Sequence, residues 1–146
     1  FYLRIYTLEL IYELLHTEPR PSKTCGFYTE LQVGIAKKAE QILTADLRKH
    51  IPVRLLAEKF SVGETSLKNY FRGVYGQNIS TYLREARMKA AAEFLEDTSR
   101  PIAEIAEQVG YSNQGKFAAV FKKQFGMSPL EYRRRKHLEC LSQEKP

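Results

Sequence analysis

Apolar residues recur at helical spacing in two short segments that a glycine separates. The first segment carries Ile102, Ile105 and Val109 on one face. The second carries a stripe spaced by three, one and four: Phe117, Val120, Phe121 and Phe125. Gly110 lies between them, and its freedom to adopt φ > 0 suits a turn of three to four residues. The pattern predicts two short helices joined by a tight turn.

A third helix is predicted directly after the second. Gly126 stands where a glycine commonly ends a helix. Ser128 has the position of an N-cap, Pro129 the first helical position, and Glu131 that of the returning carboxylate of a capping box. The helix that follows is basic. Residues 101–126 therefore predict a helix-turn-helix, whose second helix is free to enter a DNA major groove.

The same pattern occurs about 50 residues earlier, over residues 52–76. The apolar positions are Val53, Leu56, Ala57 and Phe60, followed by Leu67, Tyr70, Phe71 and Val74. Ser61-Val62-Gly63 is the predicted turn, Gly76 the stop, and Asn78 the cap of the next helix. The second copy matches the first at an offset of 49 residues before the turn and 50 after it. The one-residue difference falls in the turn, where insertions cost little.

Residues 79–96 join the two copies and are predicted to form one helix. Their composition favours helix, and one face stays apolar. Such a helix would be about 27 Å long. Two recognition helices can read successive major grooves only if they lie about 34 Å apart. A spacer helix of this size sets that separation approximately, without a dimer.

The N-terminal part holds two more helix candidates and a loop. Residues 1–16 are amphipathic and need a partner, either the rest of this chain or a second subunit. Residues 17–26 contain two prolines and a glycine and predict a linker. Residues 28–49 predict a longer helix whose well-formed part begins near Ile35, because Gly34 weakens its start.

Charge is unevenly distributed along the chain. The net charge is +6, and residues 51–136 alone hold 15 basic and 9 acidic side chains. Such an excess is what a binder of the phosphate backbone needs. Cys25 and Cys140 lie in polar segments and favour a reduced chain over a disulfide. We expect no metal, because His16, His50 and His137 share no ligand spacing with the cysteines, and no cofactor.

At this point the chain resembles the DNA-binding domain of the AraC/XylS family of bacterial transcription regulators. The resemblance covers about residues 35–135 and is most specific over Ile105–Arg135, IAEQVGYSNQGKFAAVFKKQFGMSPLEYRRR. It implies an all-α domain over residues 28–136, with two helix-turn-helix units joined by a long helix. It also implies that residues 1–27 are the end of an upstream effector-sensing or dimerising region plus a linker. Residues 137–146 are then a tail.

The resemblance assigns roles by position. The first recognition helix would present Glu64, Thr65, Ser66, Lys68, Asn69 and Arg72, and the second Asn113, Gln114, Gly115, Lys116 and Ala119. Asn and Gln can pair bidentately with adenine, and Lys with guanine. Gly115, Ala118 and Ala119 offer little, so we expect more base discrimination from the first motif. Lys122, Lys123, Arg133 and Arg134 are predicted phosphate contacts.

Two other functional classes are alternatives to DNA binding. One is an enzyme, which we do not expect, because the sequence shows no glycine-rich phosphate loop, no paired catalytic carboxylates in a recognisable motif and no nucleophile with a base nearby. The other is an all-helical protein-interaction module. The favoured hypothesis is a cytoplasmic, nucleoid-associated regulator that binds double-stranded DNA, pairs through its upstream region and senses an effector outside these residues. No apolar run has the roughly 20 residues of a membrane span.

Overall fold

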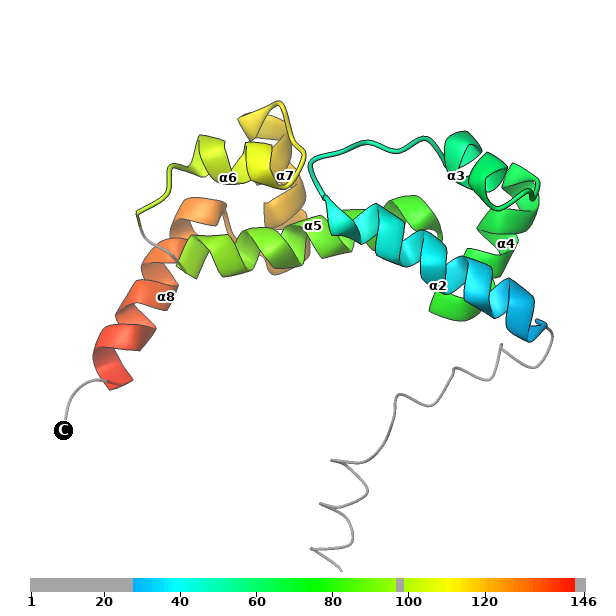
Figure 1. Cartoon of the computed structure of the whole chain (residues 1–146). Helices are drawn as coiled ribbons and strands as arrows, with labels where there is room; N and C mark the ends of the chain where they lie inside the picture. The colour runs from blue at the N-terminus through cyan, green and yellow to red at the C-terminus, as the bar shows by residue number, and fades with distance from the viewer. Residues whose placement is uncertain (1–27, 97–98, 144–146) are drawn as a thin grey trace, which may run out of the picture.

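The computed structural model describes residues 28–96 and 99–143, and all the regular structure in these residues is helical. The helices are α2 (Glu30–Ala45), α3 (Val53–Lys59), α4 (Glu64–Tyr75), α5 (Ile79–Glu96), α6 (Ile102–Gln108), α7 (Gln114–Phe125) and α8 (Pro129–Gln143) (Figure 1). This confirms the predicted all-α class. The amphipathic candidate at residues 1–16, the loop at 17–26 and Cys25 lie outside the described residues.

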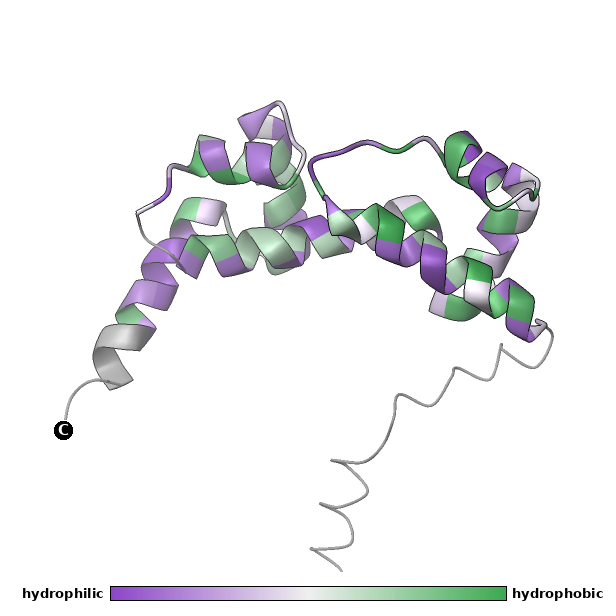
Figure 2. Cartoon of the chain, viewed as in Figure 1, coloured by the Kyte–Doolittle hydropathy of each residue, from purple (hydrophilic) through white to green (hydrophobic). Residues whose placement is uncertain are grey.

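Two separate cores form, one at each end of α5. The first joins α2, α3, α4 and the start of α5 around Leu67 and Phe71. The second joins the rest of α5 with α6 and α7 around Phe117 and Phe121, and Tyr132 of α8 packs against it. The phenylalanine stripe of α7 is therefore core, as predicted. Figure 2 shows hydrophobic and hydrophilic residues alternating along the helices of both units, as in helices that bury one face.

The predicted helix ends are confirmed by backbone geometry. Gly76 and Gly126 end α4 and α7 with φ of 73° and 75°. The Asn78 side chain accepts a hydrogen bond from the Thr81 N–H at 2.9 Å and caps α5. Ser128 and Glu131 form the expected capping box: the Glu131 N–H donates to the Ser128 hydroxyl, and the Ser128 N–H donates to the Glu131 carboxylate at 2.7 Å. That hydrogen bond holds the pKa of Glu131 below its ordinary value.

The two turns share one hydrogen-bond pattern but differ in their left-handed residue. In the first motif the Val62 N–H donates to the Ala57 carbonyl, and in the second the Tyr111 N–H donates to the Ala106 carbonyl. The residue before each donor has a positive φ, 53° for Ser61 and 83° for Gly110. The insertion in the second copy is therefore Ser112, directly after the shared part of the turn.

Helix α2 differs from its prediction at both ends. It begins at Glu30 rather than near Ile35, because Thr29 and Gln32 form a capping box that supports the first turn despite Gly34. It ends at Ala45 rather than at residue 49. Asp46 terminates it there by accepting a hydrogen bond from the Arg48 N–H and pairing with Lys49 at 3.3 Å.

Helix α8 is longer than the predicted basic helix. It runs to Gln143, through most of the segment that we expected to be a tail. Glu139 explains part of this extension, because its carboxylate pairs with Arg135 at 3.0 Å and Lys136 at 3.4 Å, one turn earlier.

Candidate nucleic-acid interface

The outer face of α4 presents the side chains predicted for the first recognition helix. Leu67 and Phe71 fix the helix by burying its opposite face. Thr65, Asn69 and Arg72 are exposed, as are Glu64 and Lys68, whereas Ser66 is partly buried. All six predicted positions of the first motif therefore lie on α4, and five of their side chains are exposed to solvent.

Glu64 has a local structural role on this face. It lies in the first turn of α4, where its charge suits the positive end of the helix dipole, although the N-cap residue is Gly63 and makes no side-chain cap. Its carboxylate lies 3.7 Å from Lys68 Nζ, and both side chains are about half exposed. Such exposed pairs contribute only about 0.2–1 kcal/mol, so Lys68 can exchange Glu64 for a base edge or a phosphate at little cost.

The predicted base-reading positions of α7 carry smaller and fewer polar side chains than those of α4. Gln114, Gly115, Lys116 and Ala119 are exposed, while Ala118 is partly buried. Asn113 is exposed but is the N-cap of the helix, because its side-chain oxygen accepts a hydrogen bond from the Lys116 N–H at 2.8 Å. A bidentate contact with adenine would use that same oxygen. The cap would therefore compete with base reading by Asn113, and Gln114 and Lys116 are the remaining exposed polar side chains at the predicted base-reading positions.

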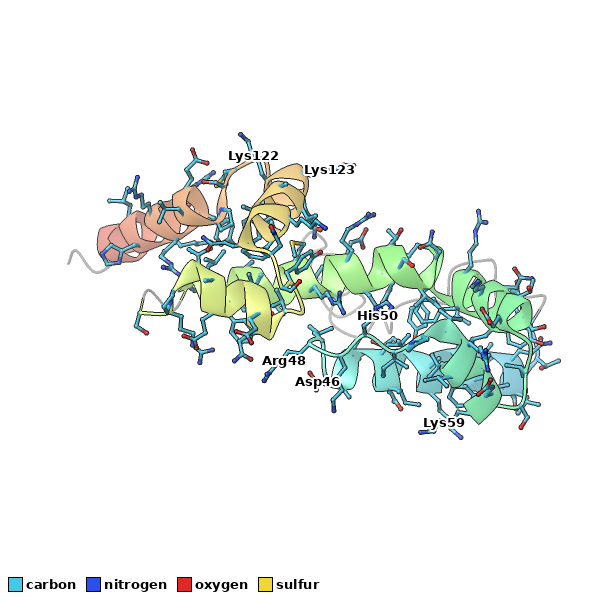
Figure 3. All side chains as sticks on the ribbon, turned by 90° about the horizontal axis from the view of Figure 1, so that it is seen from above. Asp46, Arg48, His50, Lys59, Lys122 and Lys123 are labelled. Atoms are coloured by element: carbon cyan, nitrogen blue, oxygen red, sulfur yellow. The ribbon has the colours of Figure 1, made fainter. Side chains whose placement is uncertain are left out.

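Three of the four predicted phosphate contacts are exposed cations. Lys122 and Lys123 lie in the last turn of α7, where their charges also suit the helix dipole. Figure 3 shows both pointing outward from α7. Arg134 is exposed on α8. These positions can meet a phosphate backbone without breaking an existing contact among the described residues.

Arg133 is placed differently from the prediction. Its side chain is partly buried and donates a hydrogen bond from Nη2 to the backbone carbonyl of Arg100, just before α6. Its Nε is buried. The guanidinium holds α8 against the second motif, so a phosphate contact would have to break this link. A run of three arginines in the sequence does not reveal which one turns inward, because that depends on where α6 lies.

Arg87 is a second arginine whose role the sequence did not reveal. Its Nη2 donates a hydrogen bond to the backbone carbonyl of Lys49 at 3.3 Å. Arg48, Lys49 and His50 form a basic run in the segment between α2 and α3. In Figure 3, Arg48 and His50 lie on the other side of α5 from Lys122 and Lys123, so this run is apart from the predicted phosphate contacts.

Other kinds of site find no support in the part of the chain that the structure describes. Over residues 28–96 and 99–143, no three His, Cys, Asp or Glu side chains gather where they could hold a metal ion. No helix in the described ranges combines the length and apolar character of a membrane span.

Comparison with known proteins identifies similar sequences and folds. A family model described as a helix-turn-helix domain matches residues 56–135. The regulatory protein SoxS of Escherichia coli K12 is 36% identical over 103 residues, which are 68% of this chain and 96% of SoxS. A putative AraC-like transcription regulator of Streptomyces antibioticus is 31% identical over 120 residues, 82% of this chain and 40% of that protein.

Two solved structures show the same architecture. The C-terminal domain of AraT, a response regulator from Geobacillus stearothermophilus, has a TM-score of 0.65 and 35% identity, with 69% of this chain and 84% of that chain covered. The DNA-binding domain of AdpA, solved in complex with a target DNA, has a TM-score of 0.66 over 71% of this chain and 94% of its own. At 21% identity, AdpA is a likeness of fold alone.

Proposed function

The chain belongs to the AraC/XylS family of helix-turn-helix transcription regulators, and on this premise we propose that it regulates transcription by binding specific double-stranded DNA sequences. In this proposal α4 and α7 each enter a major groove, and the two grooves follow one another along one face of the duplex.

The observation that carries the proposal is the duplication of one DNA-reading unit within a single chain. Both units have a short first helix, a tight turn, a second helix of 12 residues and a left-handed glycine at its end. Helix α5, with 18 residues, supplies side chains to both cores and is about 27 Å long. Two recognition helices read successive grooves when they lie about 34 Å apart, and a spacer helix of this size sets that separation approximately.

We propose a division of labour between the exposed side chains. Thr65, Ser66, Lys68, Asn69 and Arg72 read bases in one half-site, and Gln114, Lys116 and Ala119 read the other, with Ala119 touching a thymine methyl group. Asn113 contributes mainly as a helix cap. Lys122, Lys123 and Arg134 bind phosphates, so they add affinity without selecting a sequence. Base selection is then stricter in the half-site bound by α4 than in the half-site bound by α7.

Three further points extend the proposal beyond the described residues. The upstream region, including residues 1–16, pairs two chains, and an effector binds outside residues 1–146. The protein acts in the cytoplasm on nucleoid DNA. If the upstream region pairs two chains, the binding of one chain to DNA raises the effective concentration of the other chain near the same DNA. Affinity for operators that contain two copies of the binding site would then be higher.

A salt titration of binding to duplex DNA tests the proposal. We expect the logarithm of the association constant to fall linearly with the logarithm of salt concentration, with a slope of about −0.9 for each phosphate contacted. A variant with both Lys122→Gln and Lys123→Gln should show a slope about two contacts smaller. Absence of any complex even at low salt would contradict the proposal and favour a protein-interaction module.

A further inference from the structure

The two helix-turn-helix units touch at a small polar joint beside α5. Their cores are separate, and α5 is the one described helix that supplies residues to both. Beside the joint, the surface between the units is hollowed into an open cleft of about 840 Å³, lined among others by Arg48, Glu107 and Gln114. Because the units stand apart there, the few contacts of the joint have a large effect on their relative orientation.

Three segments meet at this joint. Arg87 extends from the middle of α5 and donates from Nη2 to the Lys49 carbonyl, in the segment after α2. Its Nε is buried there. On its other side is Gly110, the left-handed residue in the turn of the second motif. A β-carbon placed on Gly110 would lie 2.5 Å from the Leu47 carbonyl oxygen and 3.1 Å from Arg87 Cζ.

Comparison of the two turns explains why a glycine occupies position 110. The Leu47 carbonyl and Arg87 lie too close to it for a β-carbon. Ser61 occupies the same position in the first turn with a φ of 53°, so this turn geometry tolerates a side chain. Ser61 is exposed, whereas Gly110 is packed against the segment after α2 and against Arg87. The sequence therefore differs between the two copies at the point where the second copy contacts the first unit.

We propose that Arg87, with Gly110 and the Leu47–Lys49 backbone, is a positioning device that fixes the spacing and angle between the two recognition helices. If α5 were the one connection between the two units, they could bend or twist relative to each other about this helix. The joint adds a second, off-axis attachment four residues before α7 begins. Arg87 thus sets which half-site separation the protein accepts, without touching DNA. This inference rests on the proposed function only for its consequence on DNA.

The first test needs no DNA. Spin labels at Asn69→Cys on α4 and Lys123→Cys on α7, with Cys25→Ser and Cys140→Ser, report the distance between the recognition helices by pulsed electron paramagnetic resonance. Arg87→Met keeps much of the side-chain volume but removes the donor. We expect a narrow distance distribution for the parent and a broader one for Arg87→Met. Lys89→Met removes the same charge from an exposed position of α5 and should leave the distribution narrow. Equal widths in all three proteins would overturn the proposal.

The second test measures the penalty for changing half-site separation. Inserting one base pair between the half-sites rotates the second one by roughly 35°. We expect the insertion to weaken parental binding by about tenfold or more, the cost of about one mismatched base pair. The penalty should fall to about threefold or less in Arg87→Met and stay parental in Lys89→Met.

Binding to a duplex with a single half-site separates positioning from phosphate contact. If Arg87 positions the units, Arg87→Met and the charge-preserving Arg87→Lys should both keep parental affinity on this duplex. Loss of affinity in Arg87→Met with retention in Arg87→Lys would instead assign Arg87 to phosphate binding and overturn the inference. Failure of the parent to bind any duplex would contradict the proposed function, whereas the distance measurement would still decide whether the joint is rigid.

Discussion

At the scale of single residues, we propose that the interface separates side chains that select bases from side chains that bind phosphate. Asn69 is exposed in the middle of α4, on the face opposite the buried Phe71, and can pair bidentately with adenine. Lys122 lies in the last turn of α7 and carries a charge that every DNA sequence attracts equally. The same substitution at these two positions should therefore have different consequences.

Asn69→Ala is expected to reduce discrimination at one or two base pairs by about 1–3 kcal/mol each, with little change on other sequences. Lys122→Ala should instead weaken binding about equally on all sequences and reduce the salt slope by about one contact. Competition binding with a set of single-base operator variants measures both effects. An unchanged base preference in Asn69→Ala would remove this residue from the readers.

Two glycines with similar positive φ values, Gly110 and Gly126, differ in their surroundings, which gives a matched pair of substitutions. Gly126 has a φ of 75° and open space where a β-carbon would be, so Gly126→Ala should cost about 1 kcal/mol for the left-handed conformation alone. Gly110→Ala adds the clash with the Leu47 carbonyl, and we expect it to cost roughly 1–3 kcal/mol more. Urea unfolding of the two variants compares these costs. Equal losses in the free energy of unfolding would show that the backbone at Leu47 moves away from position 110 at little cost.

At the scale of helices, the local signals in the sequence determined most of the fold. The stripes of α4 and α7, the glycines that end them and the capping boxes all act within one or two turns, so their residues can be recognised without knowing the partner helices. The inward turn of Arg133 and the joint around Arg87 could not be predicted in the same way, because these two contacts join segments more than 30 residues apart. The early start of α2 does have a local signal, the Thr29–Gln32 capping box, which outweighs the effect of Gly34 on which the prediction rests.

The attachment of α5 to α2 should make stability sensitive to alkaline pH. The Tyr82 hydroxyl donates to a Glu40 carboxylate oxygen at 2.9 Å, and burial, followed by this hydrogen bond, raises the pKa of Tyr82 to about 12. Because the pKa is higher in the folded than in the unfolded chain, the stabilisation is fully present below pH 10 and is lost as pH rises toward 12.

Thermal unfolding between pH 9 and pH 12 measures this dependence. We expect the midpoint temperature to fall across the interval in the parent and to fall less steeply in Tyr82→Phe, which cannot ionise at this position. At pH 8, Tyr82→Phe should be the less stable protein, because the Glu40 carboxylate loses its donor. An identical pH profile in both proteins would show that the tyrosine is solvated in solution.

At the scale of the whole molecule, one chain carries what many helix-turn-helix proteins obtain by dimerisation. Each unit contributes one reading helix, and α5 together with the joint at Arg87 fixes how far apart the two helices lie (Figure 1). The two units have the same architecture but differ in chemistry, since the predicted base-reading positions on α4 expose more hydrogen-bonding side chains than those on α7. An asymmetric reader of this kind should recognise a site with direction, not a palindrome.

Selection of binding sites from random duplex DNA tests this central claim most directly. The structure predicts two conserved blocks whose centres are about 10–10.5 base pairs apart, one helical turn, with the block read by α4 more strongly conserved. Lys116→Ala should relax only the weaker block. Recovery of a single block, of two blocks on opposite faces of the duplex, or of no preferred sequence would contradict the account.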